Sequence, residues 1–386
     1  MKNKQFMLSA ILLLALCLTR TQAQNTQEIT NEFVFGKHFT INSQKIGEER
    51  EFIVSVPDNY NNSNKKYPVL YTMDGDWNFK IGVIGGIRYL EMLREMPEII
   101  VVSVKNTDRT RDVFPWILTS RDGSKRGGGA DNYLSFFRDE LQPFINANYR
   151  TADYRILYGQ SNSALTTVYE MFKNPQAYNA YIGSSPSLIR PFRAISDSLI
   201  SNWNGGERYL HIIDGGIDSP SLLERNINFK NKIDSIKPAG ITAEYTLLAK
   251  EGHVPKNALI LGLKDLFSGW KFDESLSEET YSAYISHYEI LSHKFNIDFV
   301  APEYELNAFG YRLMNQNDNT KKAIKVFKYI VEKYPTSWNA YDSLGEAYLK
   351  NDEKKLALKN YKKSMELNST NENAKEIISN LEKELN

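Results

Sequence analysis

The chain has 386 residues, of which 41% are hydrophobic and 24% charged, and its 47 lysines and arginines balance its 47 aspartates and glutamates. These fractions are ordinary for a globular protein with a full core, and they exclude wholesale disorder and collagen-like or coiled-coil architecture. A neutral chain without a basic block gives no electrostatic reason to expect nucleic acid or an anionic membrane surface as a partner.

The first 23 residues have the pattern of a secretory signal peptide. Two early lysines precede an apolar run over residues 6–18, which is too short for a membrane span, and Ala23 is a small residue at the cleavage position. A lipoprotein anchor at Cys17 is the rival interpretation, but the bulky Leu16 before it does not suit that processing. We expect an exported protein, periplasmic or secreted, with no membrane span after signal cleavage. Because Cys17 is the single cysteine, the mature chain is expected to have no disulfide and no cysteine-based site.

Residues 28–270 alternate short β-rich runs with helical stretches, and glycines mark the joins. Several runs are unbroken apolar segments, which is typical of a sheet that is buried on both faces. The alternation predicts the α/β class, as a three-layer sandwich with a mostly parallel sheet, and chemistry at the carboxyl ends of the strands. Strands are predicted at 51–56, 69–73, 99–104, 156–158, 180–184, 209–213 and 243–248, and helices at 81–96, 131–145 and 163–173.

The rest of the chain is predicted to be all-α, with a helical connector over residues 271–302 and a repeat region over 303–386. Small residues at fixed offsets, with aromatic residues that fill the gap between two antiparallel helices, are typical of tetratricopeptide repeats. We expect units at 303–336 and 337–370 and a capping helix over residues 372–385. These units serve either as a surface for a protein partner or as a helical buttress. The recurring residues are Phe309-Gly310 with Leu344-Gly345, Ala323 with Ala357, and Phe327 with Tyr361.

A candidate nucleophile stands where a predicted strand turns into a helix, in Gly159-Gln160-Ser161-Asn162-Ser163. A serine at so sharp a turn holds its hydroxyl above the sheet, and the backbone N–H of the next residue, Asn162, points at the same space. The turn needs small neighbours. Gly159 meets that need, and Ser163 stands where a second glycine is usual. The alternative is an ordinary turn with Ser161 as the helix cap.

Among the five histidines, His253 follows a predicted strand in a loop that leads into a helix, which is where a catalytic base is expected. An acid should come from the loop before it. Asp214 closes the preceding strand, and Asp218 lies beyond a double-glycine turn, where it has more freedom to reach an imidazole. We therefore predict Asp218 as the acid, with Asp214 as the reserve. Either aspartate could instead fix the turn.

Two further segments supply candidate site residues. The loop after strand 69–73 exposes backbone amides, so Asp76 is expected to complete the oxyanion hole with Asn162. Arg109 could hold an anionic or polyphenolic substrate, with Trp77 or Trp116 stacking on its rings. The alternative role for Arg109 is an Arg–Asp pair that stabilises its loop.

Residues 46–270 resemble the "putative esterase" family of the α/β-hydrolase superfamily, which includes siderophore, feruloyl and acetyl-xylan esterases and esterase D-like enzymes. The resemblance rests on ordered segments at 67–76, 101–112, 131–149, 154–161, 184–187 and 251–253. It implies the α/β-hydrolase fold and cleavage of carboxylic esters by a Ser–acid–His triad, without a metal or an organic cofactor. Ser161 and His253 stand at the matching positions, and Ser163 departs from the second glycine of the family motif.

Together these observations predict an exported serine hydrolase that cleaves carboxylic esters through an acyl-enzyme. Its substrate would be a small-molecule or polysaccharide-linked ester. The alternative is an inactive hydrolase-fold protein that binds a partner through its helical repeats.

Overall fold

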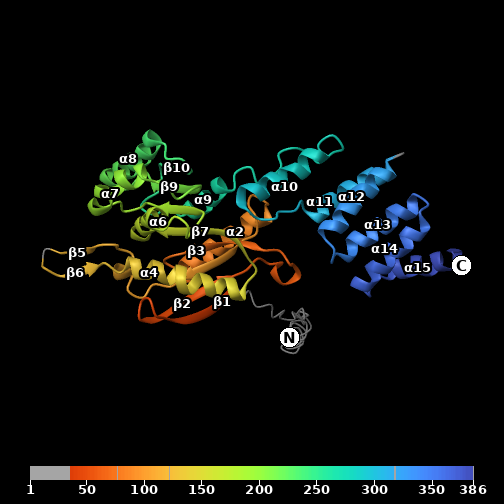
Figure 1. Cartoon of the computed structure of the whole chain (residues 1–386), viewed down its shortest axis with the longest axis horizontal. Helices are drawn as coiled ribbons and strands as arrows, with labels where there is room; N and C mark the ends of the chain where they lie inside the picture. The colour runs from red at the N-terminus through yellow and green to blue at the C-terminus, as the bar shows by residue number, and fades with distance from the viewer. Residues whose placement is uncertain (1–34, 76, 121, 317–318, 386) are drawn as a thin grey trace, which may run out of the picture. The chain divides into compact units, whose positions relative to one another are not determined.

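The computed structural model describes residues 35–75, 77–120, 122–316 and 319–385 (Figure 1). The predicted signal peptide and Asp76 lie outside these residues. The strands are β1 (Lys37–Ser43), β2 (Glu48–Ser55), β3 (Tyr67–Thr72), β4 (Ile100–Val104), β5 (Ile117–Thr119), β6 (Lys125–Gly127), β7 (Thr151–Gln160), β8 (Ala180–Ser184), β9 (Arg208–Gly215) and β10 (Ile241–Leu248). The helices of the same region are η1 (Tyr60–Asn62), α2 (Trp77–Met92), α3 (Arg109–Asp112), α4 (Ala130–Phe136), η2 (Phe137–Leu141), α5 (Gln142–Asn148), α6 (Asn162–Lys173), α7 (Arg190–Ser201), α8 (Pro220–Ile236) and α9 (Ala258–Leu266).

The main sheet has eight strands in the order β1-β2-β4-β3-β7-β8-β9-β10. Strand β2 pairs antiparallel with both β1 and β4, and each later neighbour is parallel. The central position of β7 brings the strand that precedes Ser161 into the middle of the sheet. This arrangement confirms the predicted α/β class with a mostly parallel sheet.

Successive side chains of the central strands enter two separate hydrophobic cores. Leu70 of β3 and Ile156 of β7 belong to one core, whereas their neighbours Tyr71 and Leu157 belong to the other, and all four are fully buried. Because side chains alternate between the faces of a strand, the sheet is covered on both sides. Helices α2 and α9 contribute to the first core, and α4, α6, α7 and α8 contribute to the second.

Some elements differ from the sequence-based prediction. The single helix expected over 131–145 is interrupted by the π-turn η2, which separates α4 from α5. The glycine-rich segment 123–129, where no strand was predicted, contains β6, which pairs antiparallel with β5. Strands of three residues carry too little local signal to be recognised, because only the pairing of the two stabilises them.

The C-terminal helices are α10 (Tyr281–Phe295), α11 (Glu303–Met314), α12 (Thr320–Lys333), α13 (Trp338–Lys350), α14 (Lys354–Leu367) and α15 (Glu372–Leu385), the last five in blue in Figure 1. Gly310 of α11 lies against the ring of Phe327, and Gly345 of α13 lies against the ring of Tyr361. The repeated glycine–aromatic spacing therefore corresponds to repeated helix packing. Among the described residues, no helix is both long and apolar enough to cross a membrane.

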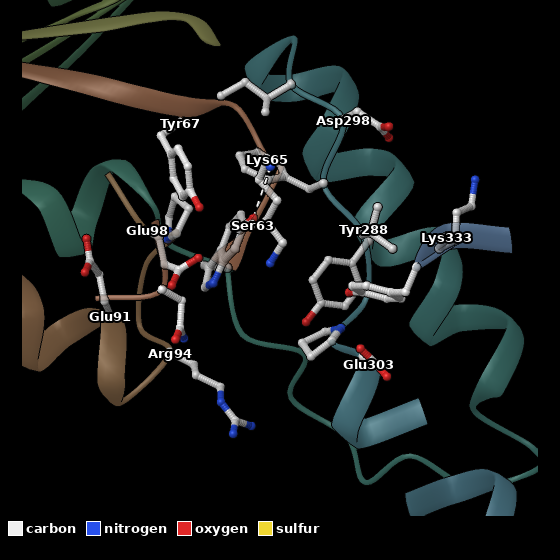
Figure 2. Close-up of a pocket in the computed structure, with 18 of the residues that line it drawn as sticks. Ser63, Lys65, Tyr67, Glu91, Arg94, Glu98, Tyr288, Asp298, Glu303 and Lys333 are labelled. Carbon is white, nitrogen blue, oxygen red and sulfur yellow. Dashed lines mark hydrogen bonds between the residues drawn. The ribbon is translucent and has the colours of Figure 1, made fainter. Parts of the chain in front are cut away.

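A cavity of about 2160 Å³ lies where the starts of β3 and β7 meet the segment that joins α10 to α11. Tyr67 and Arg94 line it from the α/β region, and Tyr288 and Glu303 line it from the helical region (Figure 2). The guanidinium of Arg94 stacks 4.0 Å from the ring of Tyr304 at the same junction. The cavity thus lies at the amino ends of the strands, the end opposite to the one that carries Ser161.

Candidate active site

The turn from β7 into α6 holds Ser161 in a conformation that non-glycine residues rarely adopt, with φ 55° and ψ −116°. Its backbone N–H donates to the carbonyl of Ser184 at 2.8 Å, which ties the turn to the neighbouring strand. A β-carbon at Gly159 would lie 2.4 Å from the carbonyl oxygen of Ser163, so the turn can close only around a glycine. The sequence-predicted strand-to-helix turn is thus present, with Ser161 at its tip.

His253 reaches this serine from 92 residues further along the chain. Its Nε2 lies 2.8 Å from Ser161 Oγ, and its Nδ1 lies 2.5 Å from Asp218 Oδ2. The loop that carries it is anchored to the end of β8, because the N–H of Val254 donates to Ser185 Oγ at 3.2 Å. Val254 and Ser185 both have positive φ, 59° and 46°. The sequence did not single out Ser185, although it falls in one of the family-like segments.

Asp218 lies in the loop after β9, beyond the glycine pair Gly215-Gly216. This loop and the histidine loop are joined by two backbone hydrogen bonds, from Gly216 N–H to Leu248 O at 2.9 Å and from Ile217 N–H to Glu251 O at 3.0 Å. The side chain of Asp218 is 10% exposed, and that of His253 is 43% exposed. The carboxylate is therefore largely shielded from water, while the imidazole remains open to a substrate.

Asp214, the reserve candidate, has a different environment. It is fully buried, and its carboxylate accepts hydrogen bonds from Asn226 Nδ2 at 3.0 and 3.1 Å and from Tyr245 Oη at 3.1 Å. Burial raises the pKa of Asp214 to about 6. Its hydrogen bonds fix β9 against α8 and β10, so of the two aspartates it is Asp218 that contacts the histidine.

One predicted oxyanion donor lies within the described residues. Asn162 is the first residue of α6, and an N–H in the first turn of a helix has no intrahelical acceptor and lies at the positive end of the helix dipole. The second predicted donor, Asp76, falls outside the described residues. Just before it, Gly75 is held against β4, where its N–H donates to Val104 O at 2.7 Å and a β-carbon would lie 2.8 Å from that same oxygen.

The predicted substrate residues have mixed environments. Arg109 binds the buried carboxylate of Asp74 through two nitrogens, with Nε 2.5 Å from Oδ1 and Nη2 2.9 Å from Oδ2. An Arg–Asp pair was the predicted alternative role for Arg109, but the partner, Asp74, lies in the loop after β3 and not in the loop of Arg109. Trp116 is half-buried and its ring packs edge-on against Tyr169 of α6, with centroids 5.5 Å apart. Trp77 begins α2. Sequence reasoning missed the contribution of Asp74.

Comparison with known proteins agrees with this fold. A family model described as "Putative esterase" matches residues 43–218, a span that includes Ser161 and Asp218. The chain is 35% identical over 63 residues to a siderophore triacetylfusarinine C esterase of Aspergillus fumigatus, a match that covers 16% of this chain and 22% of that protein. It is 25% identical over 215 residues to the ferri-bacillibactin esterase BesA of Bacillus subtilis, covering 49% of this chain and 74% of that protein.

A solved structure shares the fold. An IroE-like serine hydrolase from Shewanella oneidensis superimposes with a TM-score of 0.65 at 21% identity, covering 78% of this chain and 99% of that one. The α/β region of this chain is thus similar to the "Putative esterase" family, and two of the curated relatives are esterases.

Proposed function

We propose that this protein is an exported serine esterase that cleaves carboxylic esters through an acyl-enzyme. One observation carries the proposal: Ser161, His253 and Asp218, supplied by the ends of β7, β10 and β9, form a continuous hydrogen-bonded chain. A serine hydroxyl is a weak nucleophile unless a base removes its proton, and an imidazole oriented by a carboxylate is such a base.

In the proposed reaction, Ser161 Oγ attacks the ester carbonyl carbon while His253 Nε2 takes the hydroxyl proton. The N–H of Asn162 would donate to the oxyanion that forms on the carbonyl oxygen, together with an amide of the loop after β3. When the tetrahedral intermediate collapses, the alcohol leaves with the proton from Nε2. Water then loses a proton to the same nitrogen and attacks the acyl carbon. The bond from that carbon to Ser161 Oγ breaks, Oγ takes the proton back from Nε2, and the acid is released. Asp218 orients the imidazole and stabilises its charged form throughout.

The substrate class is proposed from the relatives. Two curated relatives are esterases of siderophores, one acting on triacetylfusarinine C and one on ferri-bacillibactin. We propose that a siderophore ester, a small molecule, is the substrate of this chain as well. Cleavage of such a ligand fits with export, which the apolar segment at residues 6–18 favours.

We also propose that residues 303–386 form tetratricopeptide-like units with α15 as their cap. The packing of Gly310 on Phe327 is repeated one unit later by Gly345 on Tyr361, which supports this interpretation. The exposed surface of these helices would then be available to a protein partner. The fully buried Ala323 and Ala357 occupy equivalent places in the two helix pairs.

The decisive experiment compares wild type with Ser161→Ala on p-nitrophenyl butyrate and on a panel of siderophore, feruloyl and acetyl esters. The variant should lose turnover on each ester that the wild type cleaves, while its melting temperature stays close to that of wild type, because one oxygen atom at the tip of a turn is removed. A fluorophosphonate probe should label the wild type and not the variant. Hydrolysis that survives Ser161→Ala would refute the proposal, and absence of labelling in the wild type would favour a binding role for the helical region.

A further inference from the structure

The strand-to-helix turn at residues 159–163, called the elbow below, contains a hydroxyl that the family motif lacks. Ser163 replaces the second small glycine, is fully buried, and donates its hydroxyl to Asp74 Oδ2 at 2.7 Å. The two residues are 89 positions apart and belong to different structural elements, since Asp74 follows β3 and Ser163 lies in the first turn of α6. The serine at position 163 therefore joins the loop after β3 to the first turn of α6.

Arg109 completes this connection from a third element. Its Nη2 donates to the carbonyl of Gln160 at 3.1 Å and to Ser163 Oγ at 3.3 Å, while its other contacts hold Asp74. A second nitrogen donor, Asn106 Nδ2, lies 2.8 Å from Asp74 Oδ1. The carboxylate of Asp74, which is 3% exposed, thus has its charge balanced by Arg109. Its oxygens accept hydrogen bonds from Arg109, Ser163 and Asn106.

The short helix that carries Arg109 is held in place by a buried ion pair. Arg50 of β2 is fully buried and binds Asp112, the last residue of the short helix that begins with Arg109. Arg50 Nη1 also donates to Thr107 Oγ1 at 2.6 Å. The helix that carries Arg109 is consequently tied to β2, and this contact supports the position of Arg109 beside Asp74.

We propose that Asp74, Arg109 and Ser163 form an elbow clamp that positions the nucleophile and the Asn162 amide against the loop after β3. This inference rests on the proposed esterase function. An oxyanion hole built from two segments works only if its donors converge on one oxygen, and an error of about 1 Å can cost roughly 10²-fold in rate. The clamp spans the two segments that the proposed hole uses. We treat its members as positioning residues, since they contact each other, Gln160 and Asn106.

The clamp and a substrate-binding role for Arg109 predict different kinetics. Loss of an interaction made only in the transition state lowers kcat and leaves KM unchanged, whereas loss of a substrate contact raises KM. Ser163→Ala and Ser163→Gly should each lower kcat on p-nitrophenyl butyrate about 10-fold at unchanged KM. Arg109→Lys keeps the positive charge beside Asp74 but loses the two-nitrogen contact of the guanidinium, so it should also lower kcat about 10-fold at unchanged KM. The inhibition constant of a boronic acid, which forms a tetrahedral adduct at the serine, should rise by the same factor as kcat falls.

Thr167→Val is the matched control. Thr167 lies one turn further along α6, is fully buried, and its hydroxyl donates to the helix carbonyl of Ser163 at 3.0 Å. Losing this hydroxyl should leave kcat near the wild-type value. The clamp is refuted if Ser163→Gly turns over like wild type, if the Ser163 variants lose activity only in step with their melting temperature, or if Arg109→Lys changes KM alone. In each of those outcomes an inactive Ser161→Ala leaves the esterase proposal standing, whereas an active Ser161→Ala removes both.

Discussion

Gly215 and Gly252 are in direct backbone contact: a β-carbon at Gly215 would lie 1.9 Å from the carbonyl oxygen of Gly252. Gly215 ends the strand before Asp218, and Gly252 immediately precedes His253. The loops of the acid and the base can therefore approach to hydrogen-bonding distance only because the first of these residues has no side chain.

This contact predicts that Gly215→Ala will displace the histidine loop. We expect kcat on a short ester to fall by about 10²-fold or more, because His253 Nε2 would leave hydrogen-bonding reach of Ser161. Gly252→Ala is the control, since a β-carbon there meets nothing within 4 Å, and it should retain most activity. Equal activity in the two variants would contradict this account of the loops.

Substitutions of the two aspartates of the same region, Asp218 and Asp214, should affect turnover very differently. Asp218→Asn is expected to lower kcat about 10³–10⁴-fold, because an amide cannot stabilise the imidazolium and favours the wrong tautomer. Asp214→Asn should keep turnover close to that of wild type, since Asp214 is bound to Asn226 and Tyr245 and not to the histidine. Steady-state kinetics on one ester decides between them. A severe loss in Asp214→Asn with an active Asp218→Asn would reverse the assignment.

His211 should make the fold sensitive to acid. It is fully buried on β9, its Nε2 lies 2.9 Å from Thr246 Oγ1, and burial lowers its pKa from 6.5 to about 4. Since the unfolded chain binds this proton at a higher pH than the folded chain does, the contribution to stability is full above pH 6.5 and is lost as the pH falls towards 4. The loss amounts to about 3 kcal/mol at most.

Urea unfolding of wild type and His211→Gln at pH 7.5 and pH 4.5 tests this effect. The free energy of unfolding of the variant should depend less on pH than that of wild type across this interval. Comparing the two chains matters because Asp214, whose pKa is raised to about 6, changes stability in the opposite direction over part of the range. Identical pH dependence in both chains would be inconsistent with a neutral buried His211.

The helix packing of the C-terminal region predicts an unusual response to a glycine substitution. Gly→Ala in an exposed helix normally stabilises by about 1 kcal/mol. At Gly310, however, the new β-carbon would lie 2.6 Å from the fully buried ring of Phe327, so Gly310→Ala should lower the melting temperature. Gly85→Ala in α2, where a β-carbon meets nothing within 4 Å, should raise it. A stabilised Gly310→Ala would show that the two helices do not pack as described.

Much of the fold could be predicted from local patterns. Apolar runs such as 180–184 and 99–104 are strands in the structure, with bounds that agree within one residue. A strand that is covered on both faces is apolar at nearly every position, so its sequence stands out as a continuous apolar run. The elbow was also local, since Gly159 and Ser161 lie two residues apart and the steric need for small neighbours acts within one turn. The short strands β5 and β6 escaped prediction because each depends on the other.

The choice between Asp214 and Asp218 shows where the sequence alone reaches its limit. Both aspartates flank the same glycine pair, and residue type and spacing allowed either to face an imidazole. Only the tertiary structure decides, because it encloses Asp214 between Asn226 and Tyr245 and leaves Asp218 free to meet a loop that arrives from β10.

The sequence by itself determined the fold class, the serine turn and the candidate histidine, because each depends on residues that are close together in the chain. The tertiary structure alone decided which acid meets His253, that Arg109 binds Asp74, and that Ser163 joins the elbow to the loop after β3. These contacts join residues 35 to 89 positions apart. Which residues meet in these contacts depends on which strands are neighbours in the sheet, and the local periodicity of the sequence does not predict that order.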